Sequence, residues 1–280
     1  MPIGRRTRAL RGLVIDPHWV NRGLAFAIVD GGRGFRDVKN SLLPSSDSST
    51  YAIGNRGPAR DYTGAQVSEF SDSWQFRLNG ALTLISGLDI DAFTNYTAIA
   101  FKQQTYWKSS FEWRHGRVNT SSADPAGAQA VLIRGNDSVL SEYCSTDGPT
   151  TTGRRVAAVS VADASLLTAP VFYVDGKRLT TGTASSSAGT VVDGGALRIG
   201  QRYDGAVQLD GRMEFLYGFA AQLSDIEIAI LSASPSRLFM PQRRFIPPAG
   251  TATAVPTITF VGAENITSTS ADYRVTLDFA

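Results

Sequence analysis

The stretch Val171–Leu179, VFYVDGKRL in one-letter code, decides the fold class of this chain. A largely apolar run leads into the pair Asp175-Gly176, and a strand-like segment follows it. Asp and Gly tolerate the positive φ angles that a tight two-residue hairpin turn requires. The stretch therefore predicts a β-hairpin whose two strands meet at Asp175-Gly176.

Short extended segments recur along the rest of the sequence, separated by clusters of Gly, Ser, Asn, Asp and Pro, as is typical of an antiparallel sandwich. Helical character is confined to Ser224–Leu231, where Ser224 and Glu227 have the spacing of a capping box. We predict an all-β antiparallel β-sandwich with one short helix. The predicted strands are Gly23–Val29, Trp74–Leu84, Tyr96–Lys102, Ser109–Arg114, Ala128–Arg134, Val139–Cys144, Arg155–Val161, Val171–Val174, Ala196–Ile199 and Gly211–Phe219.

The order of these segments resembles the second half of the laminin-G-like, concanavalin A-like jelly-roll family. The resemblance rests on YVDGK at 173–177, RIG at 198–200, DGRMEFLYGF at 210–219 and LSDIEI at 223–228. The segment 234–245 and the ending 255–271 are similar to parts of tailed-bacteriophage and prophage virion proteins. This resemblance implies a concanavalin A-like jelly roll and a structural role in a virion.

The chain divides into three expected parts: a basic N-terminal arm at 1–20, a jelly-roll sandwich at 21–246, and a linker with a C-terminal β extension at 247–280. The extension is too short to form a core of its own, so it needs a partner. An extended segment can add to an exposed sheet edge by main-chain hydrogen bonds. The predicted assembly contacts are Arg5, Arg6, Arg8, Arg243, Arg244, Phe245, Phe260 and Tyr273.

Composition excludes several classes of partner. The 280 residues include 27 Lys and Arg against 25 Asp and Glu, a net charge of +2, which is too small to capture nucleic acid by its field. No apolar run reaches the roughly 18 residues of a membrane-spanning helix, so we expect no membrane insertion.

Cys144 is the only cysteine and is predicted to be a buried, inert thiol. A single thiol suits synthesis in a reducing cytosol, including virion assembly in a bacterial host.

The acidic residues do not reproduce a glycosidase motif. Retaining enzymes of this fold carry Glu-x-Asp-x-Glu on one strand, whose period of two points all three carboxylates into one cleft. Here the nearest arrangements are Asp89 with Asp91, and Asp210 with Glu214. We therefore assign no catalytic residues and expect that the chain is not an enzyme.

Metal ligands are equally sparse. His18 and His115 are the only histidines. They lie far apart in the sequence and have no Cys or His residue at the spacing of a metal ligand, so zinc is not expected. Both histidines are predicted to be surface or capping groups. Relatives of this fold often hold calcium at the rim, which leaves Ca²⁺ as an open alternative without assigned ligands. No other cofactor is expected. The loop aspartates are Asp124, Asp137, Asp147, Asp193 and Asp204.

An aromatic cluster is the best candidate for recognition of a ligand or partner. An exposed Trp can stack on the apolar face of a sugar ring while neighbouring polar groups bond its hydroxyls. The predicted contacts are Tyr106, Trp107, Lys108 and Arg114. The alternative is that Phe111 and Trp113 alternate into the core, which leaves only the loop tip exposed.

Three functions remain at this stage. The favoured one is a non-enzymatic bacteriophage virion protein of the tail, baseplate or fibre, which docks to other virion proteins and copies of itself and has host-surface polysaccharide as a further partner. The second is a capsid decoration protein of the same fold. The third is a glycoside hydrolase or a stand-alone carbohydrate-binding module.

Overall fold

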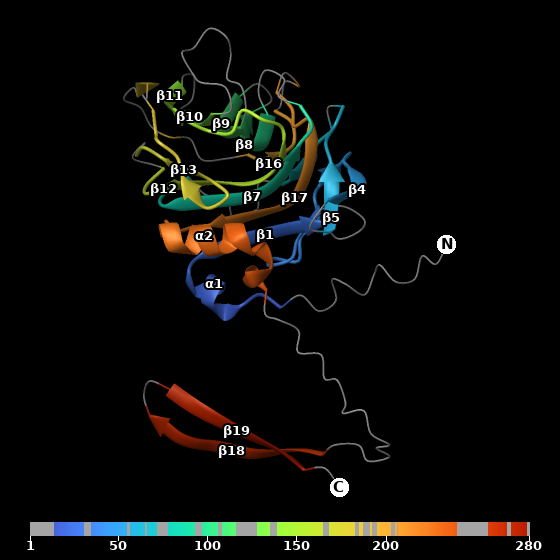
Figure 1. The fold of residues 1–280 in the computed structure, drawn as a ribbon, viewed down its shortest axis with the longest axis vertical. Coiled ribbons are helices and arrows are strands. Elements are labelled where there is room, and N and C mark those ends of the chain that lie inside the picture. The colour runs from blue at the N-terminus through green and yellow to red at the C-terminus, as the bar shows by residue number, and fades with distance from the viewer. Residues whose placement is uncertain are drawn as a thin grey trace, which may run out of the picture. The chain divides into compact units, whose positions relative to one another are not determined.

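The computed structural model describes residues 14–30, 35–54, 57–64, 66–71, 78–92, 97–105, 108–115, 128–134, 139–164, 168–182, 185–186, 191, 195–202, 205, 207–239, 257–267 and 270–278. The chain separates into two compact units, Met1–Pro241 and Gln242–Ala280. The first unit contains two antiparallel sheets and short helices (Figure 1). The predicted antiparallel β-sandwich is confirmed.

The first sheet has nine strands in the described part of the chain, with β7 and β17 at its centre. Its order is β14-β13-β12-β7-β17-β1-β2, and β5 pairs with both β17 and β4. The bounds are β1 (Leu24–Asp30), β2 (Phe35–Asp37), β4 (Thr50–Gly54), β5 (Gly57–Asp61), β7 (Leu82–Ile90), β12 (Gly153–Val161), β13 (Val171–Val174), β14 (Lys177–Arg178) and β17 (Gly211–Phe219).

The second sheet has eight strands over the same described ranges, in the order β15-β11-β10-β9-β8-β16-β6-β3. The bounds are β3 (Ser46–Asp47), β6 (Ser68–Phe70), β8 (Thr97–Thr105), β9 (Lys108–His115), β10 (Gln129–Arg134), β11 (Val139–Cys144), β15 (Ser185–Ser186) and β16 (Leu197–Ile199).

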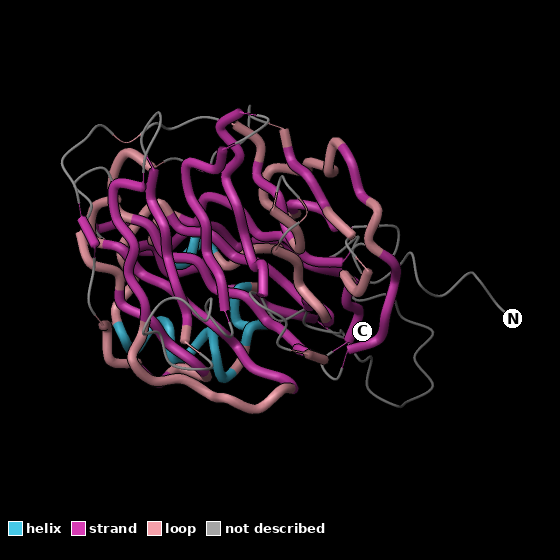
Figure 2. Tube along the Cα trace, turned by 90° about the horizontal axis from the view of Figure 1, so that it is seen from above, coloured by secondary structure: helices cyan, strands magenta, loops and turns pink. Residues whose placement is uncertain are grey.

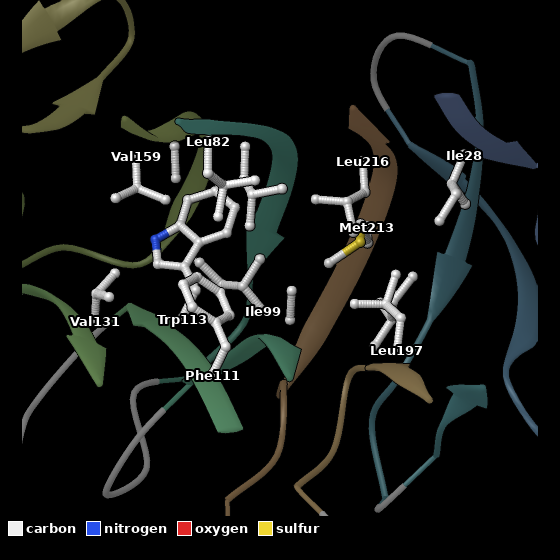
Figure 3. Close-up of a cluster of buried hydrophobic side chains, with 14 of the residues drawn as sticks. Ile28, Leu82, Ile99, Phe111, Trp113, Val131, Val159, Leu197, Met213 and Leu216 are labelled. Atoms are coloured by element: carbon white, nitrogen blue, oxygen red, sulfur yellow. The ribbon is translucent and has the colours of Figure 1, made fainter. Parts of the chain in front are cut away.

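The main hydrophobic core lies between the two sheets (Figure 3). Phe111 and Trp113 of β9 point into it and are fully buried, which confirms the packing interpretation of these two rings. The indole N–H of Trp113 donates to Gln129 Oε1 at 3.1 Å, and the Gln129 amide donates to the Tyr173 carbonyl at 2.6 Å. These bonds satisfy polar atoms that would be costly to bury alone. Cys144 is also buried, as predicted.

A second hydrophobic cluster covers the other face of the nine-stranded sheet, where short helices pack (Figures 1 and 2). They are α1 (Pro17–Asn21), α2 (Asp225–Ala233) and the 3-10 helix η2 (Pro235–Leu238). Ser224 and Glu227 form the predicted capping box at the start of α2. None of the helices in the described part of the chain is long and apolar enough to cross a membrane.

The hairpin at Asp175-Gly176 forms as predicted. Both residues have positive φ, 49° and 76°, and the flanking strands pair Val174 with Lys177. The carboxylate of Asp175 accepts a hydrogen bond from the backbone N–H of Val156 at 2.8 Å. A Cβ on Gly176 would lie 3.0 Å from the Cα of Ala229, so the turn is packed closely against α2.

Other boundaries differ from expectation. The strand predicted over Trp74–Leu84 was misplaced: residues 78–80 form a bend, and β7 runs over Leu82–Ile90, while residues 72–77 lie outside the described ranges. The segment 45–50, where no strand was predicted, contains β3 and the first residue of β4. Trp19 lies in the expected N-terminal arm, yet its ring is buried against the sandwich.

The C-terminal unit contains one antiparallel hairpin, formed by β18 (Thr257–Thr267) and β19 (Ser270–Asp278). This result confirms the expected strands in the C-terminal extension. Phe260 pairs with Val275, and Tyr273 pairs with Ala263. The assembly role of Phe260 and Tyr273 stays a prediction.

Candidate functional site

The expected ligand contacts fall at very different places. Tyr106 and Trp107 lie between β8 and β9, outside the described residues. Lys108 begins β9, and the structure describes its backbone only. The expectation that Arg114 is an exposed ligand contact is wrong. Arg114 is only 4% exposed, and its guanidinium contacts the carboxylate of Glu112 closely. The remaining assembly candidates lie outside the described ranges: Arg5, Arg6, Arg8, Arg243, Arg244 and Phe245.

The outer face of the eight-stranded sheet is polar at intervals. Leu197 and Ile199 belong to the core, so the side chain of Arg198 between them points away from it. The same alternation places Glu112 on the outer face, between Phe111 and Trp113. One continuous row of paired residues therefore crosses this face from strand to strand. The row is Ser46, Glu69, Arg198, Phe101, Glu112, Leu132, Glu142 and Ser185.

Charge is balanced within this row and beside it. The Glu112 carboxylate is fully buried and contacts two guanidinium groups, that of Arg114 closely and that of Arg202 with Nη1 to Oε2 at 3.8 Å. Arg198 Nε lies 3.7 Å from Glu69 Oε2. A buried carboxylate requires such compensation, because desolvation of a lone charge costs several kcal/mol. We call Glu69, Glu112, Arg198 and Arg202 the outer-face cluster.

The turn after β16 closes the middle of this face. In this turn the backbone N–H of Arg202 donates to the carbonyl of Val207 at 2.8 Å. The side chain of Val207 packs on Phe101. The turn thereby brings Arg202 to Glu112. The side chains that stay partly open are Glu69, at 33% exposed, Arg198, at 14%, and Arg202, at 18%. The cluster therefore offers a carboxylate and two guanidinium groups to a ligand.

The sequence analysis missed the outer-face cluster. A local signal exists, because charged residues flanked by core residues at period two must point to the opposite face. That signal identifies Glu112 and Arg198 but does not pair Arg198 with Glu69, since those residues are distant in the sequence. Arg202 lies in a turn, where no periodicity applies.

The carboxylates considered for hydrolysis are held in ion pairs. Arg212 Nη2 lies 3.3 Å from Asp89 Oδ2 and 2.8 Å from Asp91 Oδ1. Glu214 Oε2 lies 3.5 Å from Arg154 Nη2. Asp89, Asp91 and Glu214 are thus each engaged by a guanidinium group.

His115 is not the surface or capping group that we expected. It is 1% exposed at the end of β9, and its Nε2 lies 3.1 Å from Arg155 Nη1. Burial, and then the charge of Arg155, lower the pKa of His115 to about 3. A guanidinium can only donate, so the neutral ring accepts at Nε2 and carries its proton on Nδ1. His18 is exposed in α1, as expected.

Among the described residues, no group of three or more His, Cys, Asp or Glu side chains is placed to hold a metal ion. Asp147, one of the calcium candidates, accepts from the Thr180 N–H at 2.8 Å and lies 3.2 Å from the Thr180 hydroxyl. It caps a loop in this arrangement. The other candidates, Asp124, Asp137, Asp193 and Asp204, lie outside the described ranges.

Comparison with known proteins identifies the fold. No family model matches the sequence, and no curated protein matches it. Among solved structures, domain 4 of a GH43 extracellular arabinanase from Geobacillus stearothermophilus, in complex with arabinotriose, has a TM-score of 0.54 and 13% identity, covering 75% of this chain and 98% of that domain.

Two further structures resemble this chain. The binding domain of Paraclostridial Mosquitocidal Protein 1 has a TM-score of 0.54 and 8% identity, with 76% of this chain and 52% of that chain covered. Trypanosoma rangeli sialidase in complex with sialic acid has a TM-score of 0.52 and 16% identity, and the match covers 78% of this chain and 34% of the sialidase chain. The chain thus spans about half of the toxin domain and a third of the sialidase. At these identities the likeness shows a shared β-sandwich fold and no more.

Proposed function

We propose that this chain is a non-catalytic carbohydrate-binding β-sandwich, and that the outer-face cluster and the β8–β9 hairpin together contact the saccharide. The observation that carries this proposal is the set of partly exposed charged groups of Glu69, Arg198 and Arg202 on the sheet face that is turned away from the core. Phe101, Glu112 and Leu132 of the same row are buried, so the polar groups that a ligand can reach lie at the β6 and β16 side of this face. A carboxylate and two guanidinium groups at one place suit the hydroxyls of a sugar unit.

The chemistry of the cluster matches hydroxyl groups. A carboxylate such as Glu69 only accepts hydrogen bonds, while the guanidinium of Arg198 only donates them, and a hydroxyl does both. Bonds to charged groups are also the stronger ones. Trp107, in the connection between β8 and β9, supplies a ring on which a sugar can stack.

Support from the comparisons concerns the fold. The arabinanase domain was solved with arabinotriose and the sialidase with sialic acid, so sandwiches of this shape occur in proteins that contact sugars. Fold does not determine function, and the proposal for this chain rests on its own outer-face residues.

The test is binding of arabinotriose and of a panel of neutral and acidic polysaccharides, measured by titration calorimetry on the full chain. Replacement Arg198→Ala removes a charged donor, worth about 1.5–3 kcal/mol, so we expect roughly ten- to hundredfold weaker binding. Trp107→Ala should weaken binding with little change in thermal stability. Arg212→Ala, on the other sheet, is the matched control and should bind as the parent does. Binding to no saccharide, or equal loss in the control, would overturn the proposal.

We also propose a role in a virion as a second candidate, supported by the separate C-terminal unit. In the described residues, β18 and β19 pair only with each other, so each strand keeps one edge that can accept a further strand. Docking through that edge would join copies of this chain or a neighbouring tail, baseplate or capsid protein, assembled in the bacterial cytoplasm. Native mass spectrometry of the chain lacking residues 247–280 tests this role: a monomer is expected, and an oligomer equal to that of the full chain would contradict it.

A further inference from the structure

A pocket of about 420 Å³ opens on the nine-stranded sheet, beside the start of α2. Strand β13, the hairpin to β14 and the segment before α2 surround it, and Figure 1 shows β13 and α2 next to each other. Its volume falls in the range of small-ligand sites. The lining residues are Arg22, Val171, Tyr173, Arg178, Gln222, Leu223, Ser224 and Asp225.

The pocket has one apolar and one polar side. Val171 is partly exposed and provides apolar surface, whereas Leu223 is buried at the base of the pocket; Gln222 and Ser224 are exposed polar groups. Sites for small molecules commonly combine apolar walls with a few convergent polar groups that fix the orientation of the ligand. A sugar ring meets both needs, because its C–H faces are apolar and its hydroxyls lie around the rim.

The guanidinium of Arg178 and the carboxylate of Asp225 are spaced so that a ligand hydroxyl fits between them. Arg178 Nη1 lies 4.0 Å from Asp225 Oδ2, beyond hydrogen-bond distance, and both side chains are more than 60% exposed. A hydroxyl oxygen between them can accept from the guanidinium and donate to the carboxylate. The other oxygen of Asp225 accepts from the Tyr173 hydroxyl at 2.7 Å, which fixes the position of the carboxylate.

The charges favour a neutral ligand over an anion. Arg22 donates to the carboxylate of Glu227, with Nη2 to Oε2 at 2.8 Å, so that guanidinium is already matched. The charge of Arg178 is balanced by the Asp225 carboxylate at 4.0 Å, without a direct hydrogen bond. With one carboxylate for each guanidinium, the pocket offers no surplus positive charge, and an acidic group would lie near two carboxylates.

We propose that this pocket is a second saccharide site, separate from the outer-face cluster, that takes one neutral pyranose or furanose unit. The ring lies against Val171, and a hydroxyl bridges Arg178 and Asp225. The two sites lie on opposite outer faces of the sandwich, so each binds its ligand independently of the other.

The test is NMR titration of the ¹⁵N-labelled full chain with methyl glucoside, methyl galactoside and methyl mannoside, each paired with its uronide. We expect the neutral glycosides to shift the amides of Gln222, Ser224 and Asp225, and each uronide to bind at least several-fold more weakly. Arg178→Ala should weaken binding about tenfold. Lys177→Ala, the exposed neighbour outside the pocket lining, should retain parental affinity.

The outcomes separate this site from the outer-face cluster. Arg198→Ala should leave the pocket shifts unchanged, so failure of the proposed outer-face site does not alter this result. Absence of shifts with every neutral glycoside, tighter binding of the uronides, or shifts that persist equally in Arg178→Ala would each overturn the pocket proposal.

Discussion

The buried His115 should make the stability of the sandwich depend on pH, beginning above the range in which carboxylates titrate. In the folded chain its pKa is lowered to about 3, first by burial and then by the positive charge of Arg155. In the unfolded chain a His titrates near 6.5. Between these values the unfolded chain binds more protons than the folded one, so the free energy of unfolding falls as the pH falls from about 6.5 towards about 3.

The size of the effect follows from the two pKa values. Each pH unit inside the window costs about 1.4 kcal/mol for one group, less near its ends. The linkage integral gives a loss of about 1 kcal/mol at pH 6 and about 2 kcal/mol at pH 5, relative to pH 8. A protein of ordinary stability has only about 5–15 kcal/mol in total, so a loss of this size is easily measured.

The assay is urea denaturation at pH 8, 6 and 5 for the parent chain and for His115→Gln. Glutamine keeps a donor and an acceptor but does not titrate, so the variant should lose about 2 kcal/mol less than the parent between pH 8 and pH 5. The difference in slope isolates His115, because His18 and all carboxylates are present in both proteins. Equal slopes for the two proteins would refute this reasoning, even if the variant is less stable at every pH.

Three other perturbations test separate parts of the structure. Gly176→Ala should lower the free energy of unfolding by about 1–2 kcal/mol in thermal denaturation, because φ is +76° there and the new Cβ would lie 3.0 Å from Ala229 Cα; an unchanged melting temperature would contradict the turn geometry. Glu227→Gln should be less stable than the parent above pH 4.5, and the difference should vanish as the pH falls towards 2, because the bond to Arg22 lowers the pKa of Glu227 to about 2; a difference that persists at pH 2 would exclude the ionised pair as its cause. Deleting residues 247–280 should leave the melting temperature of the sandwich unchanged, since residues 1–241 form their own compact unit; a clear drop in scanning calorimetry would show that the extension supports the sandwich.

The parts of the fold that the sequence predicts are those encoded locally. The Asp175-Gly176 turn depends on two adjacent residues that tolerate positive φ. The start of α2 depends on Ser224 and Glu227, three positions apart. The alternation of Phe111 and Trp113 likewise predicts their shared face. In each case the determining residues lie within one turn or one strand.

The parts that the sequence did not predict depend on distant partners. The ring of Trp19 is buried because its indole donates to the carbonyl of Arg237 and its helix packs beneath the sheet. Helix α1 has only five residues, too few to show periodicity. His115 and Arg114 resemble surface residues in the sequence, and only the pairing of β9 with its neighbours shows that both are buried.

The two outer faces of the sandwich differ, and this difference restricts where a ligand can bind. On the nine-stranded sheet, apolar side chains such as Tyr217 and Phe219 continue on the outer face, and the helices bury them. The helices close the part of this face that they cover, and the pocket beside Asp225 opens where α2 begins. On the eight-stranded sheet, charged residues such as Arg198 and Glu69 replace that apolar surface. Charged side chains gain little by packing against a helix, since their desolvation must be offset. The two proposed sites thus lie on opposite outer faces, and the substitutions at Arg198 and Arg178 test them independently.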